Sequence, residues 1–83
     1  MSDSTKRIVY VKLKDGVLDP QGVTIQKALA QMGFDDILSV RSGRFFELEL
    51  KAGIADEEAK LNEICTKLLA NPVIEEFNLE KVS

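Results

Sequence analysis

Residues 8–33 read IVYVKLKDGVLDPQGVTIQKALAQMG, which is a strand pattern followed by a helix pattern. The strand pattern covers Ile8–Leu13, where apolar residues alternate with a period of two. This alternation places three side chains on one face, those of Val9, Val11 and Leu13. The sequence therefore predicts a first strand that buries one face and leaves the other open.

The second part of this stretch carries the signals of a helix. Asp19 can accept a hydrogen bond from a free amide N–H of the first turn, and Pro20 lacks the N–H that has no partner there. Gly33 suits the left-handed residue after a helix. The predicted helix spans residues 20–32. Its apolar stripe at helical spacing consists of Ile25, Ala28, Leu29 and Met32.

The rest of the chain predicts four more elements, with a break between each of them and the next. Two short strands, Ile37–Arg41 and Phe45–Leu50, are separated by Ser42-Gly43, a pair that suits a tight hairpin. Acidic residues from Asp56 onward favour the start of a second helix, which ends at Asn71-Pro72. Val73–Val82 reads as the last strand. The residues expected to face the core are Phe46, Leu48, Leu50, Leu61, Ile64, Cys65, Leu68, Phe77 and Leu79.

The order βαββαβ predicts an α+β domain of ferredoxin-like topology, a four-stranded antiparallel sheet with both helices on one face. Residues 1–83 are expected to form this single domain, with residues 1–6 frayed. The helix-free face of the sheet is then the informative surface. It should carry Ile8, Tyr10, Lys12, Phe45, Glu47, Glu49, Glu76, Asn78 and Glu80.

Composition limits the classes of partner. Eleven Lys and Arg against fourteen Asp and Glu give a net charge of −3, which disfavours nucleic acid and anionic membranes as partners. A single cysteine and a polar start from Met1 to Arg7 predict a reducing, cytoplasmic location. A domain of 83 residues has little core, so we expect a dimer or tetramer. The candidates for the oligomer interface are Ile8, Tyr10 and Phe45.

Catalytic chemistry is not indicated by these residues. The chain has no histidine, the commonest general base and metal ligand. Cys65 lies on the predicted buried stripe, and Glu47 and Glu49 lie on a flat sheet face that cannot separate their pKa values. The glycines are scattered and form no phosphate loop. We expect no catalytic, cofactor-binding or metal-binding residue in this chain.

Arg41 and Arg44 flank the predicted Ser42-Gly43 turn. A hairpin tip would present both guanidinium groups, which can bind a phosphate or a partner carboxylate. The alternative is that both are ordinary solvated charges.

Four segments together resemble PurS, the small-subunit family of phosphoribosylformylglycinamidine synthase. They run from Val9 to Gly22, from Leu29 to Phe34, from Val40 to Leu48 and from Leu69 to Glu75. The most specific part is GVLDPQG at residues 16–22, and NPVIE at residues 71–75 supports it. The likeness extends over residues 8–82. Family members often have Asp-Tyr after NPVIE, where this chain has Glu76-Phe77.

The resemblance implies a non-catalytic subunit of a glutamine-dependent, ATP-using C–N ligase complex in de novo purine synthesis. Such a subunit docks a glutaminase subunit and a large synthetase subunit, so that ammonia passes between them. ATP, magnesium and glutamine are used by the complex, and this chain binds none of them. Gln21 and Gly22 are candidate contacts with the synthetase subunit, because helix capping explains Asp19 and Pro20 but not these two.

Two alternatives share the predicted element order. One is a small-molecule regulatory module of the ACT type, which binds amino acids at subunit interfaces. The other is a scaffold with no ligand. Stabilisation by a free amino acid would favour the first alternative.

Overall fold

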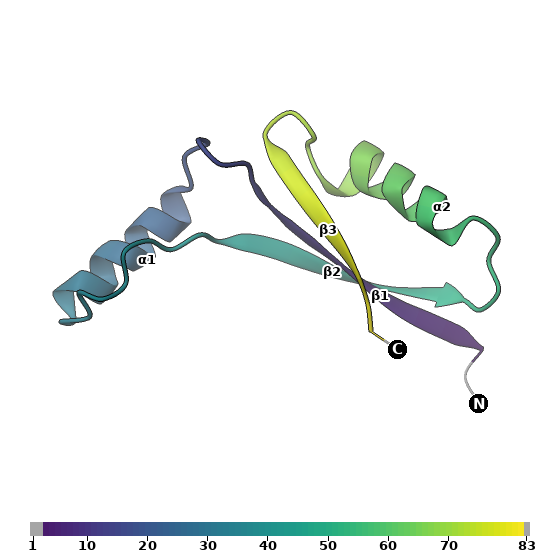
Figure 1. The fold of residues 1–83 in the computed structure, drawn as a ribbon, viewed down its shortest axis with the longest axis horizontal. Coiled ribbons are helices and arrows are strands. Elements are labelled where there is room, and N and C mark those ends of the chain that lie inside the picture. Colours follow the sequence, from purple (N-terminus) through teal and green to yellow (C-terminus); the bar gives the residue numbers. More distant parts are fainter. Residues whose placement is uncertain (1–2, 83) are drawn as a thin grey trace.

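A computed structural model describes residues 3–82 of the chain. It contains three strands, β1 (Ser4–Leu13), β2 (Gly43–Lys51) and β3 (Glu75–Lys81). The helices are α1 (Pro20–Gln31) and α2 (Glu57–Ile64), and a short π-helical segment, η1 (Cys65–Leu69), continues α2. The strand order is β2-β1-β3, with both neighbours antiparallel to β1. Figure 1 shows α2 beside this sheet, whereas α1 lies beyond the end of the sheet where β2 begins.

The core lies between the sheet and the segment formed by α2 and η1. Val9 and Val11 of β1 are fully buried, as their alternation predicted, and so are Leu61 and Cys65. Partly buried apolar side chains from the outer strands pack against this cluster, among them Phe46, Leu48, Phe77 and Leu79. The predicted inward faces of these strands are therefore confirmed.

The predicted four-stranded sheet differs from the observed one. Residues 37–42 form no strand, and β2 begins at Gly43. A two-residue hairpin turn requires positive φ, but the glycines with positive φ in the described chain are Gly16, Gly33 and Gly53. Ser42 is instead held by a hydrogen bond to Asp19. After the turns that follow α1, residues 37–42 therefore lead into β2 without forming a strand, and the ferredoxin-like pairing of four strands is absent from residues 3–82.

The position of α1 also differs from the expectation that both helices cover one sheet face. Its start and end are as predicted: the Asp19 side chain accepts from the Gly22 amide, and Gly33 has a φ of +92°. The helix nevertheless lies beyond the end of the sheet (Figure 1) and leaves its apolar stripe uncovered. Local signals defined the ends of this helix, but they did not define its position relative to the sheet.

Two further predictions need correction. Ile64 and Leu68 were expected in the core, but they are 38% and 79% exposed. Only Leu61 and Cys65 of that predicted stripe are fully buried. At the other end, β1 begins at Ser4, so residues 4–6 are paired rather than frayed, and residues 1 and 2 lie outside the described part.

The molecule is flat and long. Its principal extents are 50 × 32 × 14 Å and its radius of gyration is 16.6 Å. A compact domain of this length would have a radius of gyration of about 12 Å. No helix among residues 3–82 is both long and apolar enough to cross a membrane.

Candidate protein-interaction sites

The junction between α1 and β2 is organised by the carboxylate of Asp19. Its Oδ1 accepts from the Gly22 amide at 3.1 Å and from the Ser42 hydroxyl at 2.7 Å, and its Oδ2 accepts from the Ser42 amide at 2.5 Å. These hydrogen bonds, those from Ser42 and Gly22 amides above all, lower the pKa of Asp19. The carboxylate therefore joins the start of α1 to the start of β2 and holds the two at a fixed separation.

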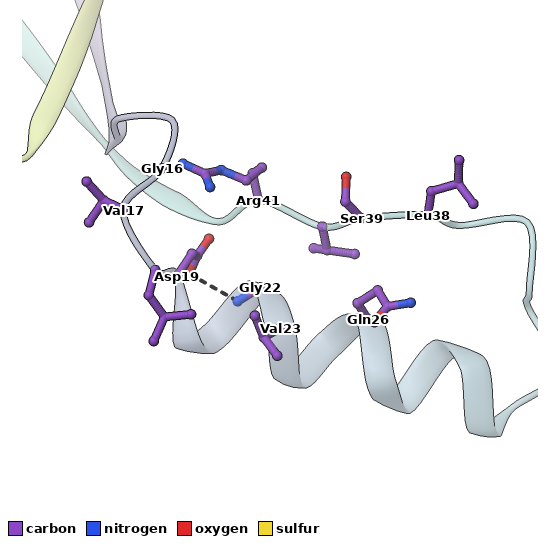
Figure 2. A pocket seen from close by; sticks show the side chains of 11 residues that line it. Gly16, Val17, Asp19, Gly22, Val23, Gln26, Leu38, Ser39 and Arg41 are labelled. Carbon is purple, nitrogen blue, oxygen red and sulfur yellow. Dashed lines mark hydrogen bonds between the residues drawn. The ribbon is translucent and has the colours of Figure 1, made fainter.

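The structure explains why residue 22 is a glycine, which helix capping alone did not explain. A Cβ at this position would overlap the carbonyl oxygen of Val40 and crowd the Asp19 carboxylate. Glycine thus permits the close approach of α1 to the extended segment 37–42. The two lie side by side around an open hollow of about 430 Å³, and Figure 2 shows Val23 and Gln26 on the helix opposite Leu38 and Ser39.

This hollow has an exposed apolar rim. Leu18 is 71% exposed and Leu38 is 89% exposed, although both line the hollow. Both side chains are thus exposed to solvent in the single chain. We refer to residues 18–42, which contain α1 and the segments on either side of it, as the arm.

The side chain of Arg41 contacts the backbone at the end of β1. Its guanidinium group donates to the carbonyl oxygens of Leu13 at 2.7 Å and Lys14 at 3.1 Å. Arg41 therefore fixes the end of β1 next to the arm. Its predicted contact with a partner stays a prediction, and no hairpin tip presents it.

Arg44 forms a second network, near the start of β2. It donates to both carboxylate oxygens of Glu75, at 2.6 and 3.1 Å, and to the carbonyl oxygen of Leu69 at 2.8 Å. Its guanidinium carbon lies 5.7 Å from the centre of the Phe46 ring. Glu75 also accepts from the Asn71 amide, and these hydrogen bonds, that from Arg44 first, lower the pKa of Glu75. The network ties β2 to the turn before β3.

Gln21 is exposed and lies in a groove of about 440 Å³ between these two networks. Asp19, Arg44 and Glu75 also line this groove. The structure thus brings Gln21 and Arg44 to one surface, and Gly22 and Arg41 to the hollow beside it. Contact of these residues with a partner is a prediction that the single chain does not test.

Ile8, Tyr10 and Phe45 lie together on the open face of the sheet, as the alternation predicted. Tyr10 pairs with Phe45 across β1 and β2, and their ring centres are 6.2 Å apart. Tyr10 is 43% exposed and Phe45 is 58% exposed. With half-buried Ile8, these rings form an apolar strip that no other element of residues 3–82 covers.

Sequence reasoning did not single out Arg7. Its side chain is 5% exposed and makes ion pairs of 2.6 Å with both Glu57 and Glu58 at the start of α2. It also donates to the Glu80 carbonyl oxygen at 3.2 Å. The available signal was its register, because Arg7 shares the inward face with Val9 and Val11. A charge on that face requires a buried partner, and the acidic first turn of α2 supplies it.

The described residues offer little catalytic chemistry. Cys65 is fully buried, and burial raises the pKa of its thiol, which opposes a nucleophilic role. Residues 3–82 contain no group of three His, Cys, Asp or Glu side chains placed to hold a metal ion.

Comparison with known proteins assigns the family. The family model described as PurS, phosphoribosylformylglycinamidine (FGAM) synthase, matches residues 6–83. The phosphoribosylformylglycinamidine synthase subunit PurS of Bacillus subtilis is 44% identical over 72 residues, which are 87% of this chain and 86% of that protein.

Solved structures agree with this assignment. The PurS structure from Methanocaldococcus jannaschii, titled as one of the subunits of formylglycinamide ribonucleotide amidotransferase in the purine biosynthetic pathway, is 35% identical, with a TM-score of 0.82. The match covers 95% of this chain and 96% of that one. A chain of the PurLQS structure from Thermotoga maritima is 28% identical, with a TM-score of 0.84, over 95% of this chain and 98% of that one. The sequence match and the shared architecture favour this assignment over the ACT-type alternative, and the chain belongs to the PurS family of FGAM synthase subunits.

Proposed function

We propose that this chain is the non-catalytic PurS subunit of an FGAM synthase complex in purine biosynthesis. It docks a glutaminase subunit and an ATP-dependent synthetase subunit, so that ammonia released from glutamine reaches the synthetase site. Membership of the PurS family is the observation that carries this proposal. The PurLQS assembly of the Thermotoga relative supports a role within a complex.

The side chains support a docking role over a catalytic one. The buried thiol of Cys65 is a poor nucleophile, and the arginines at the arm junction are held by carbonyl oxygens or by Glu75. ATP, magnesium and glutamine are therefore assigned to the other subunits. What this chain contributes is a rigid surface, because the networks of Asp19 and Arg44 fix the arm to the sheet.

We further propose that the chain works as a homo-oligomer. Its accessible surface is 6270 Å², whereas a compact monomer of this mass exposes about 4,900 Å². The excess is about 1,300 Å², and each partner of a stable interface buries about 800 Å². The surplus is thus larger than the area that one partner buries in such an interface.

The arm is the part best suited to a second copy. Its apolar residues Leu18, Leu38 and Met32 are 71%, 89% and 68% exposed. In one chain only the segment of α2 and η1 covers the sheet, whereas the sequence pattern predicts that two helices cover it. A second copy can cover the apolar side of the arm, which the flat shape of the single chain cannot do.

Reconstitution tests the docking function. The glutaminase and synthetase subunits are assayed for amidine formation with and without this chain, first with glutamine and then with an ammonium salt. We expect the chain to be required with glutamine and to matter far less with ammonium, because it governs delivery of ammonia. Equal loss of both rates on omission would mean that the chain acts on the synthetase site itself, and the docking proposal would be wrong.

A further inference from the structure

The charges on the open face of the sheet are unevenly balanced. Along β1, Lys6 lies opposite Glu49 and Lys12 lies opposite Glu76. Lys12 and Glu76 form an ion pair of 3.6 Å, and Glu49 accepts from the Ser4 hydroxyl at 2.7 Å. The charges at the two ends of the face thus have an opposite charge or a hydrogen-bond donor beside them.

The middle of the face is different. Ile8 pairs with Glu47 on one side and with Glu80 on the other. Among residues 3–82 the structure gives neither carboxylate an ion pair. They are separated by two strand spacings, about 10 Å. Next to them lie the exposed rings of Tyr10 and Phe45.

A hollow of about 610 Å³ opens beside this centre, and its lining contains Tyr10 and Glu80 as well as the paired Lys12 and Glu76. Such a surface has an apolar centre between two unpaired anions. Apolar contact with Ile8 and the two rings would bury both carboxylates as well, and a buried carboxylate requires a cation. The matching surface therefore carries two cations about 10 Å apart around an apolar group.

A second copy does not meet this requirement. In a two-fold contact the same patch lies on both sides, so four unpaired carboxylates would be brought together, and like charges placed opposite one another disfavour binding. We infer that the open face, centred on Ile8, Tyr10 and Phe45 between Glu47 and Glu80, docks a basic surface of another protein subunit and not a second copy. This inference rests on the proposed function, which supplies such a partner, and it revises the sequence-based assignment of these residues to the oligomer interface.

Charge reversal tests the inference. The variants are Glu47→Lys, Glu80→Lys and the double variant, and Glu63→Lys is the matched control because it makes the same change on the exposed surface of α2. Binding to the purified glutaminase and synthetase subunits is measured by biolayer interferometry at two salt concentrations, and self-association by sedimentation velocity.

We expect the double variant to lose about tenfold or more in affinity for one of the two subunits, with unchanged self-association and a weaker salt dependence. Glu63→Lys should match the wild type. The neutral double variant Glu47→Gln/Glu80→Gln should lose less, which separates charge from folding defects.

Two outcomes would overturn the inference. If self-association falls with the double variant, the face belongs to a second copy. If neither partner binding nor self-association changes, the face is solvated. Failure of the proposed function has its own signature, namely that wild-type chain is dispensable for glutamine-dependent amidine formation while binding is unaffected.

Discussion

The carboxylate of Asp19 accepts hydrogen bonds from both the amide and the hydroxyl of Ser42, which lies 23 residues further along the chain. A residue that the sequence marks as a helix cap is thus also the link between the arm and the sheet. The same carboxylate caps α1 through the Gly22 amide. Asp19 therefore helps to set the direction of the arm, together with Arg41, which donates to the carbonyl oxygens of Leu13 and Lys14.

Replacing Asp19 with Ala should loosen the arm without unfolding the sheet. The Ser42 and Gly22 amides lose their acceptor, so we expect their hydrogen exchange to accelerate by roughly tenfold or more. The amide of Val9 in β1, whose side chain is fully buried, should exchange at the wild-type rate. Asp15→Ala, in the exposed turn, is the control. Equal protection of Ser42 in both variants would show that Asp19 does not hold the arm.

Stability should decline in acid and in strong alkali, with a plateau between. The pKa values of Asp19 and Glu75 are lowered in the folded state, so their contributions are present above their unfolded pKa values, 3.8 and 4.5, and are lost as pH falls below these values. The pKa of Cys65 is raised above 9.0, so its contribution is lost as pH rises beyond that value. The sequence has no histidine, so urea midpoints should agree between about pH 6 and pH 8. A marked slope in that range would contradict the assignment.

Leu61 and Ile64 should respond differently to truncation. Leu61 is 1% exposed and Ile64 is 38% exposed. We expect Leu61→Ala to lower the free energy of unfolding by about 2–5 kcal/mol, and Ile64→Ala by about 1 kcal/mol or less in the monomer. Urea denaturation at low protein concentration measures both. A larger loss for Ile64 would restore the position in the core that the helical pattern predicted.

The ion pairs of Arg7 should matter far more than those on the surface. Arg7→Ala leaves Glu57, whose side chain is 23% exposed, without its cation at the edge of the core. We expect a loss of about 3 kcal/mol, because one partner of a buried pair is removed. Lys67→Ala breaks an exposed pair on α2 and should cost about 0.5 kcal/mol or less. Similar urea midpoints for the two variants would mean that Arg7 is effectively solvated.

Placing a charge on the exposed apolar surface of the arm should weaken self-association. Leu38→Asp places a charge on an arm residue that is 89% exposed, so the monomer should keep its stability while the oligomer dissociates. Val73→Asp makes the same kind of change in a turn at a residue that is 78% exposed, and should leave the oligomer intact. Sedimentation velocity at micromolar concentration gives the readout. A wild-type chain that is monomeric there would remove the basis for a second copy on the arm.

The sequence by itself determined those features that depend on neighbouring residues along the chain. The alternation around Val9 and Val11 defined β1 and its buried face, and Asp19, Pro20 and Gly33 defined both ends of α1. The motif at residues 16–22 indicated the family that the comparisons then assigned. These signals are local, so no partner is needed to interpret them.

Only the tertiary structure decided where these elements go. Ser42-Gly43 suits a turn in isolation, but the Asp19 carboxylate keeps Ser42 in an extended chain, so the predicted hairpin is lost. Arg7 occupies a core position because two glutamates 50 residues away reach it. Ile64, Leu68 and the apolar side of α1 have the pattern of buried residues and are exposed in one chain. A hydrophobic pattern specifies that a face will be covered, but not which surface, or which molecule, covers it.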